Sequence, residues 1–324
     1  MVHTRSRQRL ISEEDFPQAI QALEQQLQDR GHQGYFQSED GKSIYYEYYL
    51  ASQGTAAVVV VHGMSEFTKK YAELTHYLLE QGYHVFLYDQ RGHGMSHRDT
   101  DRPELIHINS FDQLVEDLNC YIEKIVLPKV SQPLYLYAHS MGGTVGAMYM
   151  AKYPKRFTKA VLTSPLVAPR MNDLPAWPFL LGVTIRKKFV GDLKKFRLSG
   201  EYIPGKPYQH IPGDSEARIR RCLWHRDQNR CYQSTPMTLG CVYHNLTLRR
   251  RMLKGEIGAA IQTPTLMLCA DQDHMVKLKP QEALAAQCPS MTREVLTEAN
   301  HNLLTDQQSV LEQVIDRVLE FYHG

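Results

Sequence analysis

The sequence predicts an α/β fold in which a mostly parallel sheet is flanked by helices. Short apolar and β-branched runs, typical of buried strands, alternate along the chain with segments of helical periodicity. One such run leads directly into small residues, in Ala138-His-Ser-Met-Gly-Gly143, which indicates a sharp turn from a strand into a helix. Sheets of this kind bind ligands at the carboxyl ends of their strands, so we expect the chemistry at such turns.

Length and composition describe an ordinary globular protein. The chain has 324 residues, 43% of them hydrophobic and 22% charged, which is enough for one large α/β domain with an insertion. The six cysteines are scattered without a C-x-x-C pair, which argues against a metal site and fits a reducing compartment. No apolar run approaches the roughly 18 residues of a transmembrane helix. The basic residues 1–9 precede no apolar stretch, so we expect no secretory signal.

The N-terminal part predicts a helix followed by a hairpin. Residues 1–33 form the predicted helical segment, with Ser12 placed to cap a helix whose apolar face holds Phe16, Ile20, Leu23 and Leu27. Two Tyr-rich runs, 34–38 and 43–50, flank Glu39-Asp-Gly-Lys42 and predict two antiparallel strands.

Further strands and helices alternate along the rest of the chain. The β-branched run 56–61 is typical of a strand buried on both faces. Including it, the apolar runs predict strands at 56–61, 84–88, 134–139, 159–163, 265–269 and 293–296. Amphipathic segments between them predict helices at 69–81, 111–126, 141–153, 281–288 and 309–322.

Residues 166–258 interrupt this alternation. The segment is rich in Pro, Trp and Arg, shows no buried strand, and is far too long for a plain loop. We therefore predict an inserted, mainly helical cap on a core domain formed by 34–165 and 259–324. The cap holds 17 Lys and Arg against 7 Asp and Glu, whereas the rest of the chain holds 20 against 28. Its basic residues, interleaved with apolar ones, suit an anionic membrane surface, a phosphate-bearing head group or a merely solvated face.

Three residues predict nucleophilic catalysis. Ser140 stands at the sharp turn, where its hydroxyl would be exposed, although Ala138 replaces the glycine usual two positions earlier. Asp273 and Asp271 follow a later strand, and we favour Asp273 as the acid because it lies just past the strand end. His301 follows the next strand and could act as the base. The order Ser, Asp, His, each after a strand, is that of the α/β-hydrolase fold.

An oxyanion hole is predicted beside Ser140. The segment His62-Gly63-Met64-Ser65-Glu66 directly follows the first buried strand, and Gly63 would let the backbone approach a substrate. We assign the donors to the backbone N–H groups of Met64 and Met141. Supporting roles are expected for His62, Gly63, Glu66, His139 and Gly142.

The segment Asp89-Gln-Arg-Gly-His-Gly-Met-Ser96 is interpreted as a structural turn near the site. It lacks the glycine spacing and the downstream acidic residue of a dinucleotide-binding loop. Arg91, Gly92 and Gly94 are therefore expected to shape the backbone and not to bind phosphate.

Together these segments resemble the α/β-hydrolase superfamily and, within it, the lysophospholipase and monoacylglycerol lipase branch, most closely the bacterial lysophospholipase L2 type. The motifs that carry the resemblance are 62–66, 70–74, 89–96, 107–118 and 138–143, with Ala138 before the nucleophile. The resemblance covers most of 55–165 and 263–305, and the cap is only loosely similar. Many relatives have Glu after the catalytic histidine where this chain has Asn302, which we expect to change local hydrogen bonding.

The resemblance implies a serine esterase that acts on single-chain lipids through an acyl-enzyme at Ser140, without a metal or an organic cofactor. Lysophospholipids are the favoured substrates and monoacylglycerols the second choice. Two alternatives remain open, a hydrolase of small esters or amides and a non-catalytic binding protein of the same fold. We expect a cytoplasmic protein that contacts the inner membrane surface peripherally through the basic cap. Nucleic acid is not an expected partner, because no binding motif occurs, and the oligomeric state is left open.

Overall fold

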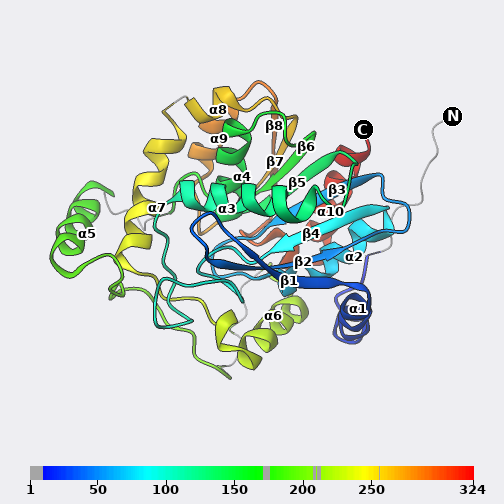
Figure 1. The fold of residues 1–324 in the computed structure, drawn as a ribbon, viewed down its shortest axis with the longest axis horizontal. Helices are drawn as coiled ribbons and strands as arrows, with labels where there is room; N and C mark the ends of the chain where they lie inside the picture. Colours follow the sequence, from blue (N-terminus) through cyan, green and yellow to red (C-terminus); the bar gives the residue numbers. More distant parts are fainter. Residues whose placement is uncertain (1–9, 171–175, 207–208, 210–212, 255) are drawn as a thin grey trace.

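The core of the molecule is one eight-stranded sheet, seen in the computed structural model of the chain (Figure 1). The structure describes residues 10–170, 176–206, 209, 213–254 and 256–324. The strand order is β1-β2-β4-β3-β5-β6-β7-β8, and the pairs from β4 to β8 are parallel while β2 is antiparallel to both of its neighbours. The strands are β1 His32–Gln37, β2 Ser43–Tyr49, β3 Ala56–Val61, β4 Tyr83–Tyr88, β5 Leu134–His139, β6 Lys159–Thr163, β7 Thr265–Ala270 and β8 Met291–Leu296.

Helices cover both faces of this sheet, which confirms the predicted fold class. Alternate residues of β3 enter two different cores, Val59 on one face and Val58 on the other, as expected for a strand buried on both sides. The first core contains residues of α3 Phe111–Tyr121, α4 Met141–Lys152 and α9 Leu278–Ala286. The second contains residues of α1 Phe16–Arg30, α2 Ala72–Glu80 and α10 Gln308–His323.

Several helix ends differ from the prediction. Asp15, not Ser12, occupies the N-cap position of α1, and the Ser12 hydroxyl instead accepts a hydrogen bond from the Asp15 N–H at 3.1 Å. Pro17, which has no N–H, sits in the first turn and explains why the helix starts at Phe16. The predicted helix 69–81 is divided into the 3-10 turn η1 Thr68–Tyr71 and α2, and α3 continues as the π turn η2 Ile122–Val126.

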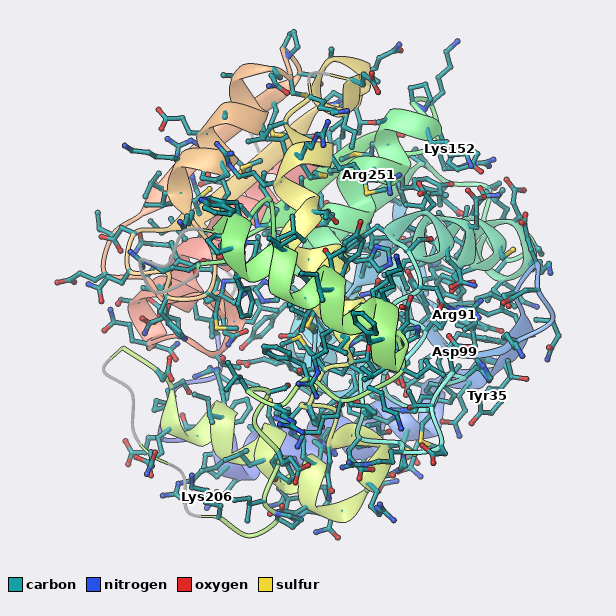
Figure 2. The ribbon with its side chains drawn as sticks, turned by 90° about the vertical axis from the view of Figure 1, so that its left-hand side faces the viewer. Tyr35, Arg91, Asp99, Lys152, Lys206 and Arg251 are labelled. Carbon is teal, nitrogen blue, oxygen red and sulfur yellow. The ribbon has the colours of Figure 1, made fainter. Side chains whose placement is uncertain are left out.

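The segment between β6 and β7 is mainly helical, as predicted. Its elements are α5 Ala176–Val190, α6 Glu216–Gln228, η3 Arg230–Tyr232, α7 Leu239–Met252 and α8 Glu256–Ala260. Figure 1 shows α5 outermost, beyond α7, and α6 beside α1. In Figure 2, where that side faces the viewer, α5 crosses in front of α7. The boundaries of a separate cap domain stay a prediction.

A buried arginine attaches this insertion to the core. The Arg218 guanidinium of α6 pairs with Glu73 of α2 at 2.8 Å and with Glu13 of the N-terminal segment at 3.0 Å. The Arg218 side chain is only 2% exposed, so these carboxylates compensate a desolvated charge. Within the part of the chain that the structure describes, no helix is both long and apolar enough to cross a membrane.

Candidate active site

Ser140 occupies a strained turn between β5 and α4. Its backbone has φ 51° and ψ −115°, a left-handed φ that a residue with a side chain rarely adopts. The Ser140 N–H donates to the Thr163 carbonyl oxygen of β6 at 2.9 Å, which holds the turn against the neighbouring strand. The sharp strand-to-helix turn expected from the sequence is therefore present.

Glycines of α4 allow the helix to pack tightly behind this turn. A Cβ atom on Gly142 would lie 2.1 Å from the Val61 carbonyl oxygen at the end of β3. A Cβ atom on Gly146 would lie 3.3 Å from the Ala138 Cβ atom, so the missing side chain of Gly146 leaves room for alanine at position 138. Gly146 was not among the predicted site residues, although a glycine inside a helix is a signal of close packing that the sequence already contains.

The three predicted catalytic side chains lie within hydrogen-bonding distance of one another. The His301 Nε2 atom is 2.9 Å from the Ser140 Oγ atom, and the His301 Nδ1 atom is 2.7 Å from the Asp273 Oδ2 atom. All three residues are buried. An oriented chain of nucleophile, imidazole and carboxylate is the arrangement that can activate a serine for acyl transfer.

Asp273, and not Asp271, approaches the histidine. Its other oxygen, Oδ1, accepts from the backbone N–H groups of Met275 and Val276, each at 2.8 Å. Burial alone would raise the pKa of Asp273, but the His301 imidazole and these N–H groups outweigh it and lower the pKa. Asp271 is exposed and instead accepts from the Ala299 N–H at 3.0 Å.

The loop after β3 has its own buried carboxylate. The Glu66 Oε2 atom accepts from the Gly63 N–H and from the Tyr71 hydroxyl, each at 2.6 Å, and Oε1 pairs with the Lys70 ammonium. Burial is the largest effect and would raise the pKa of Glu66, but the charges of Lys70 and His139 and the hydrogen bonds from Lys70 and Tyr71 together outweigh it and hold the pKa far below its usual value. Because the Gly63 N–H already donates to Glu66, the Met64 N–H is the next donor along the loop. The roles of Met64 and Met141 in an oxyanion hole stay predictions.

Asn302 joins this carboxylate to the back of the nucleophile turn. Its Oδ1 atom lies 3.2 Å from both the Lys70 Nζ atom and the His139 Nε2 atom. A glutamate in its place would bring a second negative charge close to Glu66. Burial lowers the pKa of His139 to about 4, so this imidazole is neutral at pH 7. The departure from the family pattern thus sits in a hydrogen-bond network directly behind Ser140.

His62 and the turn 89–96 support the same loops. The Gln90 N–H donates to the His62 Nε2 atom at 2.9 Å, so the His62 Nδ1–H donates to the Gly63 carbonyl oxygen at 2.6 Å. The buried Arg91 guanidinium donates to Asp117 and Asp40 at 2.8 to 2.9 Å. This position agrees with the structural role predicted for the turn.

Ser140 opens into a cavity of about 490 Å³ between the core and the insertion. Core residues that line it include Met64 and His301, and the insertion contributes Leu223, Arg226 and Met237.

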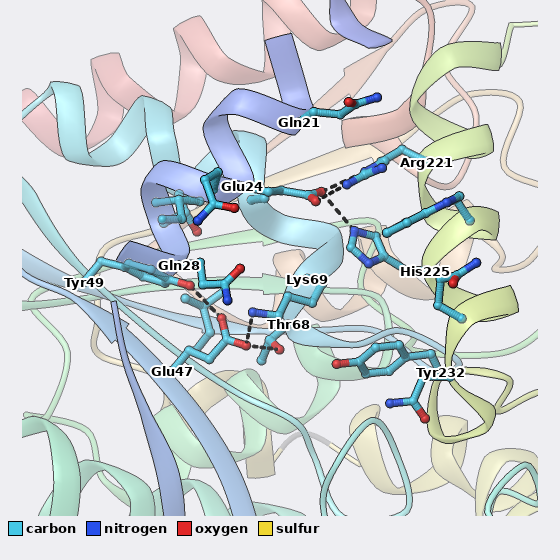
Figure 3. Close-up of a pocket in the computed structure, with 18 residues that line it drawn as sticks. Gln21, Glu24, Gln28, Glu47, Tyr49, Thr68, Lys69, Arg221, His225 and Tyr232 are labelled. Carbon is cyan, nitrogen blue, oxygen red and sulfur yellow. Dashed lines mark hydrogen bonds and ion pairs between the residues drawn. The ribbon is translucent and has the colours of Figure 1, made fainter. Parts of the chain in front are cut away.

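A larger cavity of about 660 Å³ lies between α1 and α6 and is not lined by Ser140 (Figure 3). Its charged groups are already paired, Glu24 with Arg221 and His225, and Glu47 with Lys69. The described residues contain no cluster of three or more side chains arranged to hold a metal ion.

The chain is similar in sequence to a known protein family and to curated lysophospholipases. A family model described as serine aminopeptidase, S33 matches residues 52–308. The probable lysophospholipase L2 of Haemophilus influenzae is 30% identical over 275 residues, covering 82% of each chain. The lysophospholipase L2 of Escherichia coli K12 is 26% identical over 306 residues, covering 89% of this chain and 86% of the relative.

The structure also resembles solved structures. A soluble variant of monoglyceride lipase from Saccharomyces cerevisiae, in complex with a substrate analogue, superposes with a TM-score of 0.70. The two share 17% identity, and the match covers 89% of this chain and 93% of the yeast chain. At this identity the likeness concerns the fold alone.

Proposed function

This chain belongs to the serine aminopeptidase S33 family, in the lysophospholipase and monoacylglycerol lipase branch of the α/β-hydrolases, and we propose that it is a lysophospholipase. It is a carboxylic ester hydrolase, in keeping with the lysophospholipases and the monoacylglycerol lipase that it matches over most of their length. The proposed reaction is hydrolysis of the single acyl ester of a lysophospholipid, which releases a fatty acid and the glycerophosphodiester that carries the head group.

In the proposed mechanism Ser140 is the nucleophile. His301 Nε2 takes the proton from the Ser140 hydroxyl as Oγ attacks the ester carbonyl carbon, and Asp273 holds the His301 Nδ1–H and stabilises the imidazolium. The N–H groups of Met64 and Met141 stabilise the oxyanion. After the alcohol leaves with a proton from His301, a water that His301 deprotonates cleaves the acyl-enzyme. The observation that carries the proposal is the Ser140–His301–Asp273 chain, with its distances of 2.9 and 2.7 Å.

We further propose that α5 brings the enzyme to its lipid substrate at an anionic membrane. Val183 packs against α7, while one side of α5 exposes four large apolar side chains at four-residue spacing, Trp177, Leu181, Ile185 and Phe189. α5 contains no acidic residue and three basic residues in its second half, of which Lys188 is exposed while Lys187 pairs with Asp192 at 3.0 Å. An exposed apolar stripe flanked by cations is the pattern of a helix that lies in the membrane interface. Figure 1 shows α5 at the periphery of the molecule, where it can reach a bilayer.

A substrate panel tests the proposed function. Fatty-acid or alcohol release is measured from lysophosphatidylethanolamine, monoolein and a short p-nitrophenyl ester, and we expect the highest kcat/KM for the lysophospholipid. A preference for monoolein would favour the monoacylglycerol lipase alternative, and activity on the short ester alone would favour a small-ester hydrolase. Failure of all three, together with no fluorophosphonate labelling of Ser140, would indicate a binding protein.

A further inference from the structure

Arg226 lines the same cavity as Ser140 and His301 but binds no carboxylate there. It projects from α6, and its guanidinium lies over the Tyr202 ring at 4.3 Å. The Nε and Nη2 atoms donate to neutral oxygens only, namely the carbonyl oxygens of Tyr232 and Ser234, each at 3.1 Å, and the hydroxyl of Thr235. Among the described residues, the Nη1 atom has no hydrogen-bond partner.

The other arginines of α6 have carboxylate partners, and Arg226 has none among the described residues. Each of them pairs with at least one carboxylate, Arg218 with Glu73 and Glu13, Arg220 with Glu216, and Arg221 with Glu24. Around Arg226, no carboxylate of the described residues lies within 4.0 Å. Asp227, its neighbour in sequence, accepts from the Tyr202 hydroxyl instead.

This guanidinium is half-buried, and no carboxylate of the described residues balances its charge. Burial lowers the pKa of Arg226 below its usual value, although nearby groups such as Tyr202 and Asp227 partly oppose the effect. A cation that is partly removed from water is normally paired with an anion, because neutral acceptors only partly offset the free-energy cost of its lost hydration. The cavity's other charges are engaged, Glu66 with Lys70 and Asp214 with the Asn300 amide at 3.3 Å. An anion bound in the cavity would supply the missing partner.

We propose that Arg226 binds the phosphate of a lysophospholipid head group and so determines the preference for phosphate-bearing substrates over neutral monoacylglycerols. The inference rests on the proposed function and names the residue that separates its two favoured substrate classes. Guanidinium binds phosphate by charge-assisted hydrogen bonds, and the Nη1 group of Arg226 is available for one. Arg226 is a specificity-determining residue in this account, since it sits in the substrate cavity and takes no part in the acyl transfer itself.

The competing explanation is that Arg226 only fastens the segment 231–235. Arg98 provides a matched control, because its Nη2 atom donates to the Cys231 carbonyl oxygen at 2.7 Å and to the Ser234 hydroxyl at 3.2 Å. Arg98 is likewise without a carboxylate partner among the described residues, but it does not line the cavity. Arg220 is a second control, exposed on the same helix and paired with Glu216.

The experiment measures kcat and KM for lysophosphatidylglycerol and monooleoylglycerol with the same acyl chain, both in neutral detergent micelles. For Arg226→Gln we expect the ratio of the two kcat/KM values, phospholipid over glyceride, to fall roughly 10- to 100-fold, mainly through KM. Arg226→Lys should restore part of this ratio because it keeps the charge. Arg98→Gln and Arg220→Gln should leave the ratio unchanged. An unchanged ratio in Arg226→Gln, or the same change in Arg98→Gln, would overturn the proposal.

A second measurement separates this inference from the proposed function. Glycerol 3-phosphate is tested as a competitive inhibitor of p-nitrophenyl ester hydrolysis, and its inhibition constant should rise about tenfold in Arg226→Gln. If the wild type hydrolyses no lysophospholipid but this inhibition depends on Arg226, the result contradicts the proposed function and supports the anion site at Arg226. If glycerol 3-phosphate inhibits both proteins equally or neither, the anion site falls, whatever the substrate.

Discussion

His301 lies at the centre of the site because each of its ring nitrogens faces a different partner. The Asp273 carboxylate stands on the Nδ1 side and the Ser140 hydroxyl on the Nε2 side. With Nδ1 protonated and bound to the carboxylate, Nε2 is left as the acceptor for the serine proton. The identity of the acid therefore determines whether the histidine presents the correct tautomer.

The two candidate acids can be separated by isosteric substitution. Asp273→Asn should lower kcat by about 10⁴-fold, because an amide can donate to Nδ1 and stabilise the wrong tautomer. Asp271→Asn should change kcat less than about tenfold, since the Asp271 carboxylate accepts from the Ala299 N–H, whereas the His301 ring pairs with Asp273. Steady-state kinetics on a p-nitrophenyl ester measure both, and a larger loss for Asp271→Asn would reverse the assignment.

His139 makes the stability of the fold depend on pH. Burial lowers its pKa from 6.5 to about 4, so between these values the unfolded chain binds a proton that the folded chain does not. The free energy of unfolding should therefore fall as the pH is lowered from about 6.5 to about 4. Urea unfolding at a series of pH values should show a shallower decline for His139→Gln. Equal slopes for the two proteins would contradict this role of His139.

The central residues of the site could be predicted because each follows a predicted strand within a few residues. Ser140, Asp273 and His301 carry this local signal, and their chain order adds to it. Lys70 and Asn302 carry no such signal, since they are 232 positions apart and meet only in the folded protein. Arg226 is likewise one of many basic residues in 166–258, and only the folded protein shows that it lines the cavity of Ser140 without a carboxylate partner among the described residues.

At the scale of elements, the close approach of α4 to β3 builds the nucleophile turn. The Val61 and His62 carbonyl oxygens lie where a side chain at position 142 would have to go. Both are backbone atoms, so neither can move aside without disturbing the strand end. The helix can approach this closely only because position 142 is glycine.

Gly142→Ala should destabilise the protein by about 3 kcal/mol or more, because its Cβ would lie 2.1 Å from the Val61 oxygen. Gly182→Ala is the control, since no atom lies within 4 Å of a Cβ on that residue of α5. Alanine there should be neutral or stabilise the helix by up to about 1 kcal/mol. Chemical unfolding of the three proteins measures the difference, and equal stabilities for Gly142→Ala and the wild type would refute the packing argument.

The apolar side of α5 should be required for binding to anionic vesicles. The Trp177→Ser, Phe189→Ser double variant removes side chains that are 71% and 81% exposed, so it should weaken binding without unfolding the protein. Val295→Ser, at an exposed position of β8, is the control. Co-sedimentation with phosphatidylglycerol vesicles at two salt concentrations measures the effect. Binding that is insensitive to α5, to anionic lipid and to salt would exclude this surface.

The strands were more predictable than the helix ends. The runs 56–61 and 159–163 match β3 and β6 residue for residue, because strands buried in a parallel sheet are themselves continuous apolar runs. α9 begins at Leu278, three residues before its predicted start, with Pro280 in its first turn, where proline is tolerated. The π turn after α3 has no sequence signal of its own, since it depends on how the helix packs.

At the scale of the whole molecule, charge and chemistry are divided between two parts. Residues 166–258 carry the excess of basic residues, and the rest of the chain, which holds Ser140, Asp273 and His301, is acidic overall. Arg218 fastens α6 to the core through buried ion pairs, whereas α5 contacts the molecule chiefly through α7. In this account the insertion selects and delivers the lipid, and the residues that follow the carboxyl ends of β5, β7 and β8 cleave it.

The most direct test of this account is fatty-acid release from lysophosphatidylethanolamine by the wild type and by Ser140→Ala. The wild type should release the fatty acid, and the variant should lose about 10⁴-fold or more in kcat while keeping the circular dichroism spectrum and unfolding midpoint of the wild type. A folded Ser140→Ala protein that retained more than a few per cent of the activity would contradict the assignment of Ser140 as the nucleophile.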